Sequence, residues 1–274
     1  MTFWQSVLAF LDSSMETPDS FGWFHLLWFA ITFLALIPLL RFPKKPSGDH
    51  VRRVVLITAI AVIILEIYKQ INYSFSYEDG IVFDYQWYAF PFQFCSTPMY
   101  IGLLAGLAKK GTLYECLCAY LATYAVFAGL AVMIYPNDVF ISTIGINIQT
   151  MICHGSMITI GIYLFATGHV KLQHRTILKA IPVFAITVSM AAAMNEIAYG
   201  VGLLETETFN MFFISPHCEP SLLVYSEVQR VFPFPFCLII YILGFTAAAY
   251  VILLFAMGIG KLVHKKQPVC EAVS

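Results

Sequence analysis

Charged residues are scarce in this sequence. They make up 11% of the 274 residues, against about a quarter in a typical soluble domain. Hydrophobic residues make up 59%, and the mean hydropathy is +0.78. With a net charge of −1 and no basic aromatic surface, we expect no nucleic-acid partner. This composition is typical of a protein that lives in a membrane.

Several familiar motifs are also missing. The seven cysteines form no CxxC pair, so we expect neither a metal site nor a disulfide framework. The last apolar run has no lysine to hold retinal, and the Asp-Arg-Tyr and Asn-Pro-x-x-Tyr motifs of G-protein-coupled receptors do not occur. No inverted repeat of the kind found in many transporters is visible. A structural or assembly role is not excluded by any of these absences.

Long apolar runs dominate what remains, and runs of roughly 20 residues can cross a bilayer as helices. The N-terminus has no basic segment ahead of the first run, so we expect that run to be a true span and not a signal peptide. Residues 1–11 predict a short helix at the membrane interface. We therefore predict an all-α, polytopic protein with a single domain of seven spans: 21–40, 54–72, 88–108, 113–134, 146–166, 176–198 and 233–259.

The basic residues predict the orientation. Thirteen of the 15 lysines and arginines fall in alternate connections or after the last run, whereas acidic residues fill the other connections. The positive-inside rule then places the N-terminus outside and the C-terminus in the cytoplasm.

The connection at 199–232 is long for a compact domain, and long loops often cover a site. Its stretch NMFFISPHCEP is apolar, and Pro216 and Pro220 interrupt any continuous helix. We expect it to cap the outer mouth of the bundle, with Asn210 and Pro216 over the site. A solvated connector is the alternative.

Polar residues inside spans are costly and usually face the bundle interior. At about 1.5 Å per residue, Cys95 in the third run and His154 in the fifth both lie roughly 10–12 Å below the outer edge. A thiol beside an imidazole can become a nucleophilic thiolate that attacks acyl carbon. We expect a polar shell around this pair, which orients the groups or binds an oxyanion: Glu66, Gln93, Thr97, Asn147, Thr150 and Asn195.

Three stretches carry a family resemblance: FPFQFCSTPMY, NIQTMICHGSM and MNEIAYGVGLLETETFNMFFISPHCEP. They resemble the YwaF family of bacterial integral membrane proteins, which is related to transmembrane protein 164 of animals. Where members read Leu-Pro-Leu-His-Leu-Cys, Pro91 and Cys95 match and Gln93 replaces the histidine. Cys153 replaces a second histidine before His154, and the Asn-Tyr-Met pattern is Asn210-Met211-Phe212 here.

The animal relative is a cysteine-dependent acyltransferase that moves fatty acyl chains between phospholipids. The resemblance therefore implies Cys95 as nucleophile, His154 as base, phospholipid and lyso-phospholipid substrates, no cofactor, and a bacterial plasma membrane. Hydrolysis is the related possibility. The main rival function is transport of a small polar solute or proton, with Glu66, His154 and Glu196 as a relay. Nothing in the sequence indicates the oligomeric state.

Overall fold

A computed structural model describes residues 1–43, 45–219 and 222–265. Within these ranges, six helices or pairs of successive helices are long and apolar enough to cross a membrane. They are Trp23–Arg41, Gly48–Ser74, Thr112–Ile134, Ile144–Ala166, Arg175–Gly200 and Phe234–Leu262. The chain is therefore a multi-pass integral membrane protein built mainly of helices.

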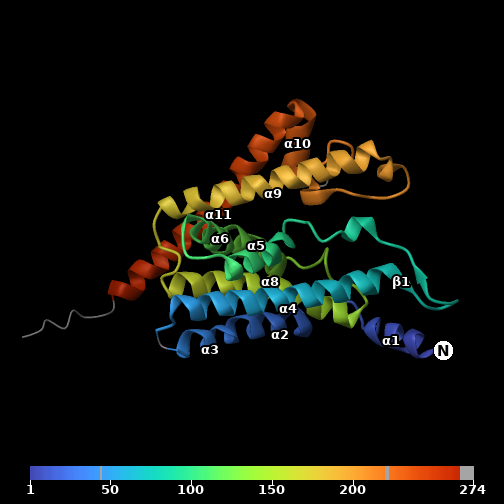
Figure 1. Ribbon diagram of the computed structural model, residues 1–274, viewed down its shortest axis with the longest axis horizontal. Coiled ribbons are helices and arrows are strands. Elements are labelled where there is room, and N and C mark those ends of the chain that lie inside the picture. Colours follow the sequence, from blue (N-terminus) through green and yellow to red (C-terminus); the bar gives the residue numbers. More distant parts are fainter. Residues whose placement is uncertain (44, 220–221, 266–274) are drawn as a thin grey trace, which may run out of the picture.

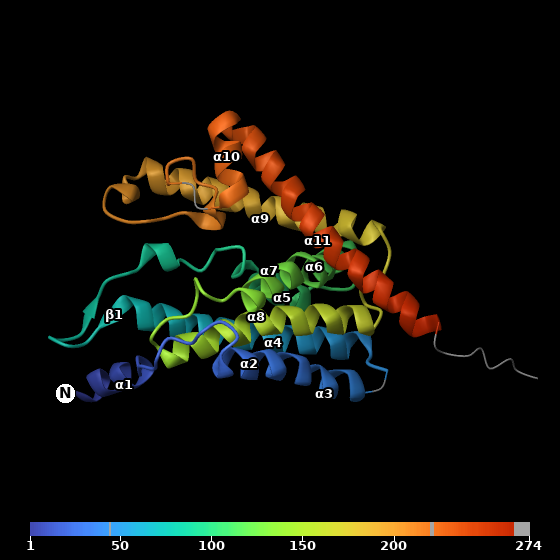
Figure 2. The same ribbon diagram turned by 180° about the vertical axis from the view of Figure 1, so that it is seen from behind.

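The helices lie side by side in a bundle (Figures 1 and 2). One layer holds α2 (Trp23–Leu34), α3 (Leu36–Arg41), α4 (Gly48–Ser74) and α8 (Ile144–Ala166). Next come α5 (Thr97–Leu107), α6 (Thr112–Ala122) and α7 (Tyr124–Ile134). The far layer holds α9 (Arg175–Gly200), α10 (Leu223–Val231) and α11 (Phe234–Lys265).

Helix α8 forms the centre of the bundle, in contact with α2, α4, α6 and α7. Glycine permits its closest approaches. A Cβ on Gly129 of α7 would lie 2.6 Å from the carbonyl oxygen of His154, and one on Gly155 would lie close to Thr32 of α2. The small residues thus bring the backbones of these helices together, as is common in membrane bundles.

The N-terminal segment forms helix α1 (Phe3–Leu11), as its sequence predicts. A capping box between Thr2 and Gln5 starts it. Phe3, Trp4 and Phe10 are strongly exposed, in keeping with a helix that lies at the lipid interface.

The third apolar run departs from the prediction of a continuous span over 88–108. Only α5 is an α-helix there, and its 11 residues reach about 16 Å, roughly half of the ~30 Å hydrocarbon core. A short hairpin, β1 (Phe75–Ser76) with β2 (Val82–Phe83), precedes it, followed by the 3₁₀ turn η1 (Trp87–Ala89) and irregular backbone. Pro98 lies in the first turn of α5, where a missing N–H does no harm, so it begins the helix instead of kinking it.

The first and fourth runs are also interrupted. Ala35 separates α2 from α3, and Thr123 separates α6 from α7. The hydroxyl of Thr123, which is fully buried, donates 2.7 Å to the carbonyl of Ala119 and so satisfies an acceptor at the break. Hydropathy cannot detect such breaks, because the residues on both sides are apolar.

The middle of the segment 199–232 is buried in the bundle. It contains η2 (Leu203–Glu205), η3 (Met211–Phe213) and α10. Met211, Phe212 and Ile214 have no exposed surface. The Asn195 side chain donates 3.0 Å to the Met211 carbonyl and accepts 2.7 Å from the Met211 N–H. This pair of bonds fixes η3 against α9.

We predict that Asn195→Ala lowers the free energy of unfolding by roughly 2–4 kcal/mol, because two buried backbone groups of Met211 lose their partner. Gln173→Ala, which removes an exposed amide, should change stability little. Thermal unfolding of both purified variants in the same detergent measures the difference. Equal stability of the two would contradict a fixing role for Asn195.

Candidate functional site

Glu66 of α4 lies at the centre of a buried polar cluster and is only 4% exposed. Its Oε1 accepts from Lys69 Nζ at 2.7 Å and from Gln70 Nε2 at 2.9 Å. Its Oε2 accepts from Gln149 Nε2 of α8 at 3.3 Å. Both carboxylate oxygens are therefore partnered inside the protein, and the bond to Gln149 links α4 to α8.

Helix geometry explains part of this cluster. Residues three and four apart share a face of α4, which brings Lys69 and Gln70 next to Glu66. Gln70 continues the network outward, since it donates to the carbonyl of Ala89 at 2.8 Å and accepts from the Tyr85 hydroxyl at 2.9 Å. The cluster thus ties α4 to the irregular segment that precedes α5.

Tyr85, which the sequence analysis missed, acts as a neutral donor. Burial and then the charge of Glu66 raise the pKa of Tyr85 above its usual value. Its proton is therefore retained in the bond to Gln70 at neutral pH. An aromatic residue in a short connection gave no signal of this role.

His154 of α8 is buried, at 6% exposed, and its two ring nitrogens differ. Nδ1 lies 2.7 Å from the carbonyl oxygen of Thr150, and a carbonyl only accepts, so Nδ1 carries the hydrogen. Nε2 is then the unprotonated nitrogen of the neutral ring. It is buried with no hydrogen-bond partner in the part of the chain that the structure describes. Thr150 contributes its backbone, one turn earlier, and not its hydroxyl.

Cys95 lies in the irregular segment just before α5 and is half-buried. Its side chain packs against the apolar core of the bundle. No hydrogen bond joins Cys95 to His154 in this conformation, because Nε2 has no partner.

Three amides of the expected polar shell bind backbone instead of facing Cys95. Gln93 donates to the carbonyl of Asn210 at 2.9 Å and accepts from the N–H of Phe212 at 2.8 Å. Asn147 donates to the carbonyl of Ile141 at 2.7 Å and accepts from its N–H at 3.0 Å. With Asn195, these amides hold irregular segments in place.

Thr97 is buried and has two hydroxyl contacts. Its Oγ1 donates to the Phe94 carbonyl at 2.9 Å and lies 2.8 Å from the Tyr120 hydroxyl. The first bond satisfies the carbonyl of Phe94, which lies just before α5 begins. Tyr120 of α6 has no exposed surface and was missed by the sequence analysis. Its phenol inside an apolar run was the available signal.

The two loop residues expected over the site, Asn210 and Pro216, lie in different places. Asn210 lies against Gln93, and its Oδ1 accepts from the N–H of Ser215 at 2.9 Å. Pro216 instead lines a separate pocket of about 470 Å³ with His217 and Cys218. The segment around Asn210 is thus packed on the backbone next to Cys95, whereas Pro216 lies in different surroundings.

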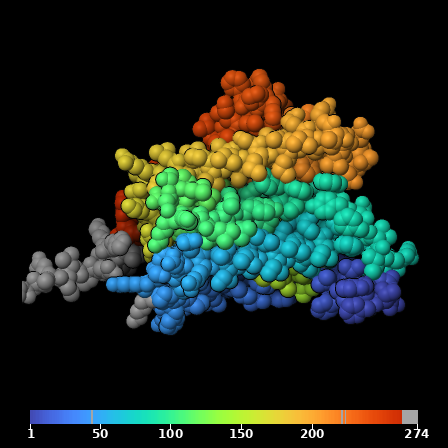
Figure 3. Space-filling view, in the orientation of Figure 1, coloured from blue at the N-terminus to red at the C-terminus, as the bar shows by residue number. Residues whose placement is uncertain are grey.

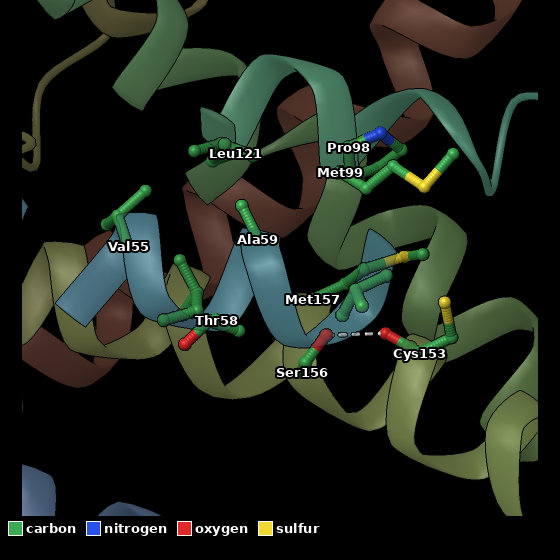
Figure 4. Close-up of a pocket in the computed structure, with 12 residues that line it drawn as sticks. Val55, Thr58, Ala59, Pro98, Met99, Leu121, Cys153, Ser156 and Met157 are labelled. Atoms are coloured by element: carbon green, nitrogen blue, oxygen red, sulfur yellow. Dashed lines mark hydrogen bonds between the residues drawn. The ribbon is translucent and has the colours of Figure 1, made fainter. Parts of the chain in front are cut away.

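A narrow space lies between α4, α5 and α8 (Figure 4). Val55 and Ala59 line it from α4, Met99 from α5, and Cys153 and Met157 from α8. Its volume of about 30 Å³ is close to that of a single water. Ser156 donates to the carbonyl of Cys153 at 2.7 Å, so its hydroxyl is already satisfied. This space is too small for a substrate.

The apolar helices of the bundle enclose the Glu66–Lys69 ion pair, the half-buried Cys95 and the unpartnered Nε2 of His154. These features are those of a polytopic membrane protein with polar groups in its interior. The model of the TMEM164 family matches residues 20–257. The chain belongs to the TMEM164 family. No curated protein and no solved structure matches it.

We predict that Glu66→Gln destabilises the protein more than Glu207→Gln does, because it leaves the Lys69 ammonium buried without its counter-charge. Adding Lys69→Met to Glu66→Gln should recover part of the loss, since it removes the unpaired charge. Unfolding of the three variants and the parent in one detergent gives the comparison. A double variant no more stable than Glu66→Gln alone would show that the ion pair does not govern this effect.

Proposed function

We propose that this protein transfers or hydrolyses fatty acyl chains of membrane phospholipids through an acyl thioester on Cys95, with His154 as general base. The observation that carries the proposal is the Nε2 of His154, which is buried and has no hydrogen-bond partner within the described ranges, while Nδ1 bonds the Thr150 carbonyl. A buried polar atom left unpaired costs free energy and marks a place where a group is expected to bind. A thiol proton is what such a nitrogen accepts.

The reaction divides into two halves. His154 Nε2 takes the proton of Cys95, and the thiolate attacks the carbonyl carbon of a phospholipid ester. The ester C–O bond then breaks, and the imidazolium returns the proton to the leaving lyso-phospholipid oxygen. In the second half, the hydroxyl of an acceptor lyso-lipid, or water, loses its proton to Nε2 and attacks the thioester. The C–S bond breaks and the proton returns to sulfur.

Catalytic hydrogen bonds are often long in the free enzyme and shorten when substrate binds, which accommodates the absence of a Cys95–His154 bond here. The family membership adds the resemblance to a cysteine-dependent acyltransferase.

Proton or solute transport through Glu66, His154 and Glu196 has less support. Glu196 lies toward the surface, where its carboxylate bonds His217 at 3.1 Å. Both oxygens of Glu66 are bonded to fixed neighbours. A relay needs groups that exchange partners, and no bond links these three residues in the described ranges.

The proposal includes a topology. We propose seven crossings, in which the irregular segment before α5 completes the third, with the N-terminus outside and the C-terminus in the cytoplasm of a bacterial plasma membrane. The division of basic residues supports this orientation. Irregular backbone at membrane depth is tolerated where it is buried in protein, and Gln93 and Thr97 supply such bonds.

We expect Cys95→Ala to abolish acyl transfer between phospholipids, and His154→Ala to lower its rate at least 100-fold, the scale of a lost general base. Cys116→Ala is the matched control, because Cys116 is also half-buried but lies on α6 outside the site. Purified variants in vesicles with a labelled phospholipid and a lyso-phospholipid give the rates. Full activity of folded Cys95→Ala would rule out the thioester.

For the topology, Lys110→Cys should resist an impermeant thiol reagent in intact cells, whereas Asp79→Cys should react. Both positions are exposed, so access depends on the side of the membrane. The native cysteines are replaced in both variants, and permeabilised cells provide the control in which both label. The reverse pattern in intact cells would invert the orientation.

A further inference from the structure

A groove on the side of the bundle runs along α4. Helix α4 forms one wall of the groove. Strand β2, the segment between β2 and α5, and α5 itself form the other wall, and the volume of the groove is about 290 Å³. These two parts of the chain lie next to each other on one face of the molecule (Figure 3). Ile63, Ile67 and Met99 line one end, and Ser74, Phe75 and Tyr85 line the other.

The groove offers a ligand mainly apolar side chains. Glu66 and Gln70 also line it, but their polar atoms are bonded to Lys69, to Gln149 and to each other. Phe83 and Ile67 are 61% and 54% exposed, so the groove is open at its edge. Its occupant must therefore be mainly hydrocarbon.

One buried polar atom among the residues that line the groove has no partner in the described ranges. The Oγ of Ser74 is buried, with the residue only 3% exposed, and no hydrogen bond reaches it in the described ranges. A helical serine hydroxyl often bonds the carbonyl one turn earlier, and Ser74 does not. It lies in the last turn of α4, at the end of the groove next to the hairpin. It can donate one hydrogen bond to an oxygen there.

Length and volume select the occupant. From Ile63 to Ser74 the helix rises about 16 Å, about half of a ~30 Å hydrocarbon core. The groove therefore extends through one leaflet, with its hydroxyl near the surface and its apolar end near the midplane. Its volume lies at the lower limit of ligand pockets, which suits one acyl chain and not a whole lipid.

We propose that this groove binds one acyl chain of a membrane glycerophospholipid from the leaflet at the hairpin end, with the Ser74 hydroxyl donating to the ester carbonyl. The bilayer supplies this ligand at high local concentration. The polar Ser74 end of the groove matches the ester carbonyl of the lipid, and the apolar end matches its acyl chain. The inference requires only the membrane setting and the groove. It stands whether or not Cys95 reacts with the lipid.

The test uses a phosphatidylcholine with a photoreactive diazirine in its acyl chain, in vesicles that contain the full chain with Cys95→Ala, so that acyl transfer cannot interfere. Mass spectrometry of the digested protein should place most adducts on residues 63–75 and 83–100. Ile67→Trp, which adds bulk at the groove wall, should lower these adducts at least fivefold. Ile64→Trp, a substitution at a neighbouring exposed position of α4 outside the groove, should not.

Ser74→Ala provides the second arm, and it removes only one oxygen. Loss of a neutral hydrogen bond should lower the occupancy-limited labelling roughly threefold to tenfold. Labelling spread evenly over the exposed faces of all helices would overturn the proposal. So would labelling of the groove by a photoreactive free fatty acid alone, which would assign the site to free acids and not to phospholipid.

Discussion

Irregular backbone inside a bundle of membrane helices must find its hydrogen bonds within the protein, because lipid tails offer none. The segment before α5 and the segment around η3 both meet this condition, and they meet it partly through each other. Gln93 bonds both backbone neighbours of Met211, and Asn195 bonds Met211 itself. The side-chain amides of Gln93 and Asn195, which bond backbone N–H and C=O groups as a neighbouring β-strand does, thus hold the segment before α5, the segment around η3 and α9 together. The position of Cys95 depends on this arrangement.

One polar atom of the candidate site is an exception to this pairing of hydrogen-bonding groups. Glu66, Lys69 and Gln149 satisfy one another, and the amides satisfy the loops. Only Nε2 of His154 stays unpaired among the polar atoms of the candidate site residues. The imidazole is held by Thr150 through Nδ1, so in the neutral ring the lone pair of Nε2 is free to accept a proton. Function is inferred from this contrast and not from the fold.

Length and hydropathy predicted six of the membrane-crossing segments to within a few residues, because twenty apolar residues in a row have few other uses. They did not predict the break at Thr123 or the short α5, since the bonds that permit such breaks come from single side chains. Depth counting singled out Cys95 and His154, of which His154 is buried and Cys95 half-buried. It could not tell that Asn147 and Asn195 bind backbone, because burial of an amide is the same signal for a loop anchor and for a catalytic donor.

The groove along α4 adjoins the polar cluster, since Glu66 and Gln70 line the groove and belong to the cluster. The two proposals are nevertheless separable, because the lipid ester is proposed to lie at Ser74, eight residues from Glu66 along the helix.

The central claim is that Cys95 carries the acyl chain during turnover. Mass spectrometry of the protein after brief incubation with phospholipid vesicles, without an acceptor, tests it most directly. The account predicts a mass increase of one acyl group on the peptide that contains Cys95, released by hydroxylamine and absent from His154→Ala. An acyl group found on another residue, or an active protein that never acquires one, would contradict it.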